Sequence, residues 1–240
     1  MPETLPITAE DIAASSARKH LLCVNGLMKN TLIRALNRIL AVVPSIKFQC
    51  DDASVIGFME YIAVFCDMAL LHLAGDERFL KSTEQGPALI EVFGSESNPN
   101  VPHLREGLEK LRAATIGWKE SPATATAQEL EGLLGEGDEL AKTMVRQWEL
   151  MRDGDLGKDL EDETLGKMIQ ENIAWISGNS DITVLLPFIL AHHDPATAEA
   201  WPQVTDEGLA EVPKMVELRK ECWKFAPFDP ATRNLQALAL

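Results

Sequence analysis

Basic residues are scarce in this chain of 240 residues. Lys and Arg number 22 against 37 Asp and Glu, which gives a formal net charge of -15 at pH 7. Nucleic acids and anionic membranes are both bound through clustered Lys and Arg, so this composition argues against either partner. It says nothing against a neutral small molecule.

Aromatic residues are also few. Phe, Trp and Tyr make up 6% of the chain, and Tyr61 is the single tyrosine. The core must therefore be built mainly from Leu, Ile, Val, Ala and Met, a mixture that suits helices better than sheets. No alternating strand pattern and no internal repeat is visible. The sequence predicts an all-α fold in a single domain over residues 1–240.

Cysteine motifs and targeting segments are missing as well. The four cysteines lie far apart without a CxxC pair, so we expect reduced thiols near the core, not a zinc site or a disulfide scaffold. The segment "MPETLPITAEDIAASS" has neither the basic nor the apolar region of a secretory signal. The longest apolar runs, "ALLHLA" and "VLLPFILA", are too short and interrupted to span a bilayer. We expect a soluble, cytoplasmic protein.

Helical periodicity dominates what is present. Long helical patterns cover residues 8–43, 51–85, 103–120 and 156–176. Thr8, with Asp11 three residues on, is the predicted N-cap of the first pattern. Residues 121–151 begin with a loop and a small-residue segment, and residues 225–240 form a Pro-punctuated, irregular arm.

Three groups of polar side chains could carry chemistry. His72 and Asp76 are four residues apart, as are Asp159 and Glu163, so each pair projects from one helix face. The third group ends an apolar run and comprises His192, His193 and Asp194. Carboxylate-bridged metal sites in helical bundles use such i, i+4 pairs. Acids at this spacing are also ordinary on a solvated helix face.

The order of these motifs resembles a hemerythrin-like (HHE cation-binding) domain of the fungal type. The similar segments are "MKNTLIRALNRI" (28–39), "LLHLAGDERFL" (70–80), "DLEDETL" (159–165), "LLPFILAHHD" (185–194) and "CWKFAPFDP" (222–230). The resemblance covers about residues 27–230. It implies a hemerythrin-like up-down helical bundle with additional helices and an irregular C-terminal arm.

Several metal ligands of that family are replaced here. The replaced positions are Lys29, Leu71, Asp76 and Asp159, the retained ones are His72, Glu163, His193 and Asp194, and the third-helix position falls on His103 or Arg105. An ammonium at Lys29 would put positive charge where the cation would sit. A buried ammonium is tolerated only beside a carboxylate, so we hypothesise that Lys29 pairs with Asp159 or Glu163 in place of a metal.

Two classes of function follow from this hypothesis. In the first, the bundle core is a pocket for a small apolar organic substrate. The chain would be a metal-independent lyase or cyclase of secondary-metabolite biosynthesis, using dehydration, isomerisation or pericyclic-type cyclisation and no cofactor. The predicted catalytic residues are Lys29, His72, Asp76, Asp159, Glu163 and His193.

The second class is a metal- or oxygen-binding hemerythrin-like protein. A mononuclear non-haem iron would be held by His72, Asp76, Glu163 and His193. A non-catalytic helical bundle whose polar pairs lie on the surface is a third alternative. Homodimer formation stays open in each case.

Overall fold

A computed structural model describes most of the chain. The described residues are 1–13, 16–46, 48, 53–81, 101–135, 137–154, 156, 158–199 and 201–237. Within these ranges the regular structure is helical, apart from one isolated β-bridge between Phe228 and Leu235. The all-α prediction is therefore confirmed.

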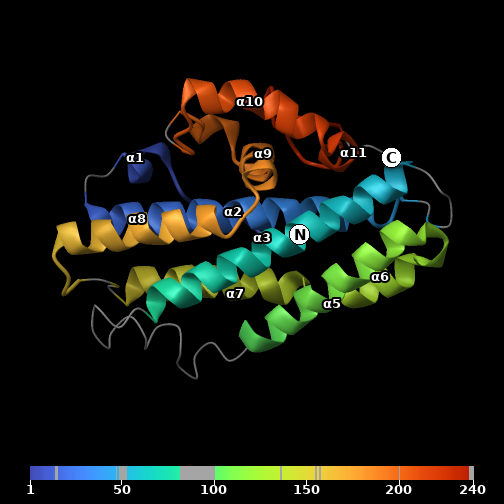
Figure 1. The fold of residues 1–240 in the computed structure, drawn as a ribbon. Helices are drawn as coiled ribbons and strands as arrows, with labels where there is room; N and C mark the ends of the chain where they lie inside the picture. The colour runs from blue at the N-terminus through green and yellow to red at the C-terminus, as the bar shows by residue number, and fades with distance from the viewer. Residues whose placement is uncertain are drawn as a thin grey trace.

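Four long helices pack in a ring. They are α2 (Ala17–Val42), α3 (Ala53–Leu80), α5 (Val101–Glu120) and α7 (Gly137–Asp153). Each helix packs against the next, and α7 closes the ring by contacting α2. Successive members run in alternating directions (Figure 1). The short helices η2 (Pro122–Thr124) and α6 (Ala127–Leu134) connect α5 to α7.

A second layer of helices covers one side of this ring (Figure 1). It comprises α8 (Asp162–Gly178), α9 (Ile182–His192), η3 (Pro195–Thr197), α10 (Asp206–Glu217) and α11 (Lys220–Trp223). Helix α8 packs against both α2 and α3, α9 packs on α2, and α11 packs on α3. The ring helices α2 and α3 are therefore enclosed from two directions, which makes their shared interface the most deeply buried part of the molecule.

Three predicted boundaries differ from the structure. Thr8 does cap a helix, since its Oγ1 accepts a hydrogen bond from the Asp11 amide (3.3 Å), but that helix is the short α1 (Ala9–Ile12). A new N-cap, Ser16, then begins α2. The late helix begins at Asp162 instead of residue 156. Residues 121–151, expected to begin as a loop, contain α6 and most of α7.

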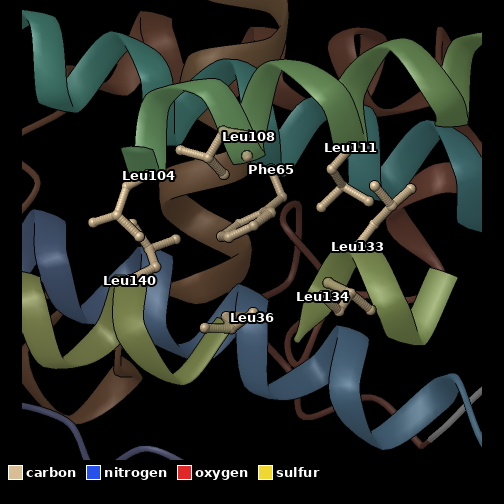
Figure 2. A pocket seen from close by; sticks show the side chains of 9 residues that line it. Leu36, Phe65, Leu104, Leu108, Leu111, Leu133, Leu134 and Leu140 are labelled. Atoms are coloured by element: carbon tan, nitrogen blue, oxygen red, sulfur yellow. The ribbon is translucent and has the colours of Figure 1, made fainter. Parts of the chain in front are cut away.

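The core is filled by apolar side chains. A gap of about 30 Å³ within it is lined by leucines and Phe65, with no charged or hydrogen-bonding side chain (Figure 2). The expectation that no segment could span a bilayer needs correction. Among the described residues, α3 is long and apolar enough by composition, and α8 with α9 passes only as a pair bent by 115°. However, 67% of the most apolar window of α3 is buried inside the protein, as in the central helix of a core.

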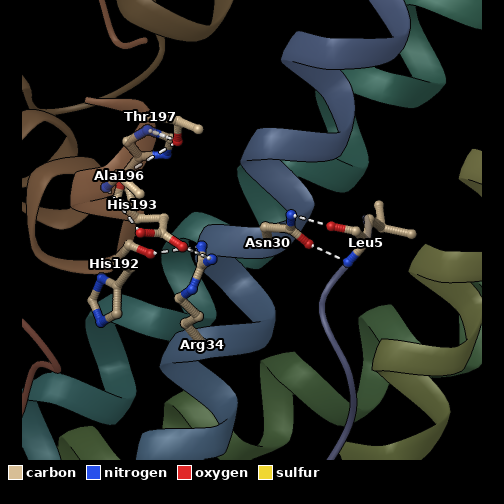
Figure 3. A network of polar contacts seen from close by, with 8 residues as sticks. Leu5, Asn30, Arg34, His192, His193, Ala196 and Thr197 are labelled. Atoms are coloured by element: carbon tan, nitrogen blue, oxygen red, sulfur yellow. Dashed lines mark hydrogen bonds and ion pairs between the residues drawn. The ribbon is translucent and has the colours of Figure 1, made fainter. Parts of the chain in front are cut away.

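Both ends of the described chain are attached to α2. The N-terminal strap (residues 1–8) is held by Asn30, whose amide accepts a hydrogen bond from the Leu5 N–H (2.6 Å) and donates one to the Leu5 carbonyl (3.0 Å; Figure 3). The C-terminal arm (residues 224–237) is held by Arg38, which donates to the carbonyls of Phe225 (2.9 Å) and Ala237 (2.9 Å).

Candidate functional site

Lys29 lies at the interface of α2 and α3 and is fully buried. Its Nζ donates a hydrogen bond to Oδ2 of Asp76 (2.6 Å) and another to Nε2 of His72 (2.9 Å). Asp76 also accepts a hydrogen bond from the amide of Asn25 (2.8 Å). We call these four side chains the Lys29 cluster. The i, i+4 spacing correctly placed His72 and Asp76 on one inward face of α3.

His72 is neutral at pH 7. Burial lowers its pKa to about 4, and the charge of Lys29 lowers the pKa further, against the opposing effect of Asp76. A neutral imidazole has one ring nitrogen that accepts and one that donates. Because Lys29 donates to Nε2, this nitrogen is the acceptor and the ring proton is on Nδ1.

Asp76 remains ionised. Burial by itself would raise the pKa of its carboxyl group, but the neighbouring His72, the charge of Lys29 and the hydrogen bonds from Lys29 and Asn25 together lower that pKa more strongly. The pKa of Asp76 is therefore lowered from its usual value of 3.8. At neutral pH the cluster thus contains one buried ion pair beside one neutral base.

Helix α7 brings two further polar side chains into the interior. Thr143 and Gln147 are four residues apart, and both are buried. Neither the oxygen nor the nitrogen of the Gln147 amide has a hydrogen-bond partner among the described residues. The indole of the adjacent Trp148 donates to the carbonyl of Leu22 (2.9 Å), so this turn of α7 lies one turn of α2 before Asn25. Gln147 is therefore a polar interior residue close to the level of the Lys29 cluster.

Sequence reasoning missed Thr143 and Gln147. The same signal that identified His72 and Asp76 was available, since polar residues at i and i+4 interrupt an apolar stripe of α7 formed by Leu140, Met144 and Met151. The segment that contains them was instead expected to begin with a loop and a small-residue stretch.

Asp159 and Glu163 do not belong to the cluster. Both are exposed, Asp159 in a turn and Glu163 in the first turn of α8. The predicted pairing of Lys29 with either of them is wrong, because its carboxylate partner is Asp76. The start of α8 is fixed near the start of α2, where Asp162 accepts a hydrogen bond from the amide of Ala17 (2.9 Å). Twelve residues of α2, about 18 Å along the helix, separate this point from Lys29.

His193 also lies elsewhere, at the C-terminal end of α9 (Figure 3). It is buried, and its Nε2 is hydrogen bonded to Oγ1 of Thr197 (2.9 Å). The neighbouring His192 bonds the hydroxyl of Tyr61 (2.6 Å) through Nε2 and the carbonyl of Phe188 (2.7 Å) through Nδ1. Asp194 is an ion-pair partner of Arg34 and caps η3.

The two candidates for the third-helix position are outside the cluster too. His103 is exposed in the first turn of α5. Arg105, two residues further along α5, is part-buried and donates a hydrogen bond to the carboxylate of Glu77 (2.6 Å). The six predicted catalytic residues are thus divided among three places, and only Lys29, His72 and Asp76 come together.

The residues present do not fit the iron site of the second alternative. Lys29 already binds Nε2 of His72 and Oδ2 of Asp76, the atoms that would face a cation. Glu163 and His193, the other two proposed ligands, lie apart from them. Across the part of the chain that the structure describes, no three His, Cys, Asp or Glu side chains are grouped so as to hold a metal ion.

A pocket approaches the cluster from the N-terminal strap. It has a volume of about 460 Å³, and its walls include Ile7 of the strap, Leu22 and Cys23 of α2, and Trp148 of α7. Leu22 and Cys23 are within one helical turn of Asn25, which hydrogen bonds Asp76. The thiol of Cys23 is unreactive at neutral pH, since burial raises its pKa to about 11. The pocket therefore borders the turn of α2 that precedes Asn25.

Comparison with known proteins adds no relative. No family model, no curated protein and no solved structure matches this chain.

Proposed function

We propose that this chain is a metal-independent small-molecule enzyme, a lyase or cyclase, on a degenerate hemerythrin-like bundle. The observation that carries the proposal is the direct contact, deep between α2 and α3, of an ion-paired lysine with a neutral histidine. An acid and a base held at hydrogen-bond distance are what proton-transfer catalysis requires. Titratable groups with pKa values displaced by burial are characteristic of such sites.

The resemblance supports the fold part of the proposal. The ring of α2, α3, α5 and α7 has the alternating directions expected of an up-down bundle (Figure 1). The resemblance assigns family ligand positions to Lys29, His72 and Asp76, and these three side chains meet between α2 and α3. In this chain the cation position is served by the ammonium of Lys29, neutralised by Asp76.

The chemistry we propose is elimination or isomerisation of a neutral, largely apolar substrate. Lys29 uses two of its N–H groups on His72 and Asp76, which leaves one for an oxygen of the substrate. In a dehydration, Lys29 protonates the departing hydroxyl and the C–O bond breaks with its electron pair. The hydrogen bond from Lys29 to His72 breaks, and the freed lone pair of Nε2 removes the proton from the adjacent carbon, whose C–H electron pair forms the C=C bond.

The Lys29–His72 contact would also reset the site. After the reaction Lys29 is a neutral amine and His72 is an imidazolium. Nζ of Lys29 and Nε2 of His72 are 2.9 Å apart, so a single proton transfer restores the starting state. Asp76 favours this return, because its negative charge stabilises the ammonium. The substrate is released as an unsaturated product together with water.

A substrate can be admitted by way of the strap pocket. Its walls combine apolar side chains with the charged Glu10, Asp11, Lys19 and Arg152, so they suit an organic molecule that also carries polar groups. Entry to the cluster requires the side chains around Asn25 to move. The substrate class is therefore a neutral hydroxylated carbonyl compound small enough for a pocket of about 460 Å³.

The test is a deuterium-exchange assay that needs no natural substrate. Purified protein is incubated in D₂O with a panel of apolar β-hydroxy ketones, and exchange at the α-carbon and loss of water are followed by NMR and mass spectrometry. We expect exchange that survives chelation and disappears in Lys29→Met and His72→Gln. His193→Gln, outside the cluster, serves as the control. Exchange that depends on added iron, or that is unchanged in both cluster variants, would sink the proposal.

A further inference from the structure

The C-terminal arm presents an arginine in an uncommon conformation. Residues 228–235 form a small hairpin through the Phe228–Leu235 bridge, and the amide of Phe228 bonds the carbonyl of Ala191 at the end of α9 (3.2 Å). Within this hairpin Arg233 has a φ of 62°, in the left-handed region that favours glycine. A side chain kept in such a conformation is often functional.

Two donors of Arg233 have no acceptor. Nε and Nη2 are both buried, and no described residue accepts a hydrogen bond from either. These nitrogens lie on the same side of the guanidinium group and are the pair that binds the two oxygens of a carboxylate. Burial lowers the pKa of Arg233, and no carboxylate of the described residues counteracts this. Burial also lowers the pKa of Arg34, but Arg34 has Asp194 as its ion-pair partner, and the charge of Asp194 partly offsets that effect.

His193 lies beside this arginine. The hydrogen bond from Phe228 to Ala191 brings the hairpin of Arg233 to the end of α9, two residues before His193. In keeping with this placement, the charge of Arg233 contributes to the low pKa of His193 after the larger effect of burial. His193 is fully buried, and its Nδ1 has no hydrogen-bond partner. The ring of Trp201 packs against the imidazole in an edge-on arrangement, with centroids 4.8 Å apart. An unpartnered polar atom and an aromatic wall thus adjoin the unpartnered arginine.

We propose that Arg233, with His193 and Trp201, forms a binding site for the carboxylate group of a small aromatic or apolar acid. The unused Nε/Nη2 pair supplies the two parallel hydrogen bonds that a carboxylate accepts. Trp201 supplies an apolar contact for the remainder of the acid. Arg233 supplies one positive charge without a carboxylate partner among the described residues, which favours an anionic ligand at this position.

This site is separate from the Lys29 cluster. Arg233 belongs to the C-terminal arm and His193 to the end of α9, whereas Lys29 lies between α2 and α3. The proposal therefore stands whether or not the chain is a lyase.

The test measures binding of benzoate by NMR and calorimetry, with acetate, inorganic phosphate and chloride at equal ionic strength for comparison. We expect saturable benzoate binding that shifts the ring resonances of His193 and weakens at least ten-fold in Arg233→Gln. Arg233→Lys keeps the charge but removes the paired donors, and should bind several-fold more weakly than the native chain. Arg146→Gln, which removes an exposed arginine, should leave the affinity unchanged.

Several outcomes would overturn the carboxylate site. Equal affinity in the native chain and in Arg233→Gln would show that Arg233 does not bind the acid. Chloride as effective as benzoate would show non-specific screening, and phosphate preferred over both carboxylates would show a different ligand class. Arg233→Gln should fold, because the guanidinium donors that it removes have no partner, and a native circular dichroism spectrum checks this.

Discussion

Replacing Lys29 by methionine should show how much the ion pair of the Lys29 cluster contributes to the stability of the fold. Methionine fills a similar volume but leaves the buried carboxylate of Asp76 with the amide of Asn25 and, at 3.4 Å, Nε2 of His72 as its neighbours and no ammonium. His72 also loses the hydrogen bond to its Nε2. Removing one partner of a buried ion pair costs about 3–5 kcal/mol, so we expect a loss of that order in the free energy of unfolding at pH 7.

The pH dependence of this loss identifies its cause. In the native chain the pKa of Asp76 is lowered, so the ion pair contributes stability above pH 3.8 and loses it as the pH falls through the folded-state value. Without Lys29, burial dominates and the pKa of Asp76 rises above 3.8. The variant then loses stability as the pH rises. The difference between the two proteins should therefore shrink steadily from pH 7 to pH 4.

Urea unfolding of both proteins across this pH range is the assay. The double variant Lys29→Met/Asp76→Leu removes both charges and should recover most of the lost stability. Lys142→Met, at an exposed lysine that pairs with Glu139, is the matched control and should change stability far less. A pH-independent loss, or a double variant no more stable than Lys29→Met, would refute the ion-pair account.

Three other outcomes are expected. The free energy of unfolding should fall as the pH drops from 6.5 toward 4. Burial holds the pKa values of His72, His192 and His193 at about 3 to 4, so only the unfolded chain takes up protons in this pH range. A urea midpoint that does not change with pH would contradict this. Tyr61→Phe leaves Nε2 of His192 unpartnered and should cost about 1–3 kcal/mol by urea unfolding, whereas an unchanged midpoint would mean that the bond contributes nothing. Gly26→Ala places a Cβ 2.8 Å from the indole of Trp148 and closer still to Ile7 of the strap, so the strap should be displaced and proteases should cleave it faster. Gly117→Ala, where the added Cβ meets nothing within 4 Å, is the control and should be cleaved no faster than the native chain.

The fold class was predictable from the sequence because it depends on patterns within single segments. The apolar periodicity of α3 and α5 located both helices to within a few residues. The division of the first predicted helix into α1 and α2 was not predictable from periodicity, since the same apolar spacing holds whether or not a new helix begins after Ser16. Caps decide such boundaries, and Ser16 was overlooked as one.

The candidate site was only partly predictable for a different reason. Spacing fixes which side chains share a helix face, and it correctly paired His72 with Asp76. It does not fix which faces meet, and that depends on where each helix starts. Lys29 was matched with the wrong carboxylate because the resemblance assigned Asp159 and Glu163 to ligand positions, whereas α8 begins only at Asp162 and both side chains are exposed. Gln147 was missed because its helix was expected to begin as a loop.

The attachment of both chain ends to α2 has a consequence for biosynthesis. Asn30 holds Leu5, which is made just before α2, but Arg38 holds Phe225 and Ala237, which are made long afterwards. The helix that is translated early therefore cannot complete its contacts until residue 237 has emerged from the ribosome. A nascent chain stalled before that point should carry an α2 that is uncovered around Arg38, and it should depend on chaperones.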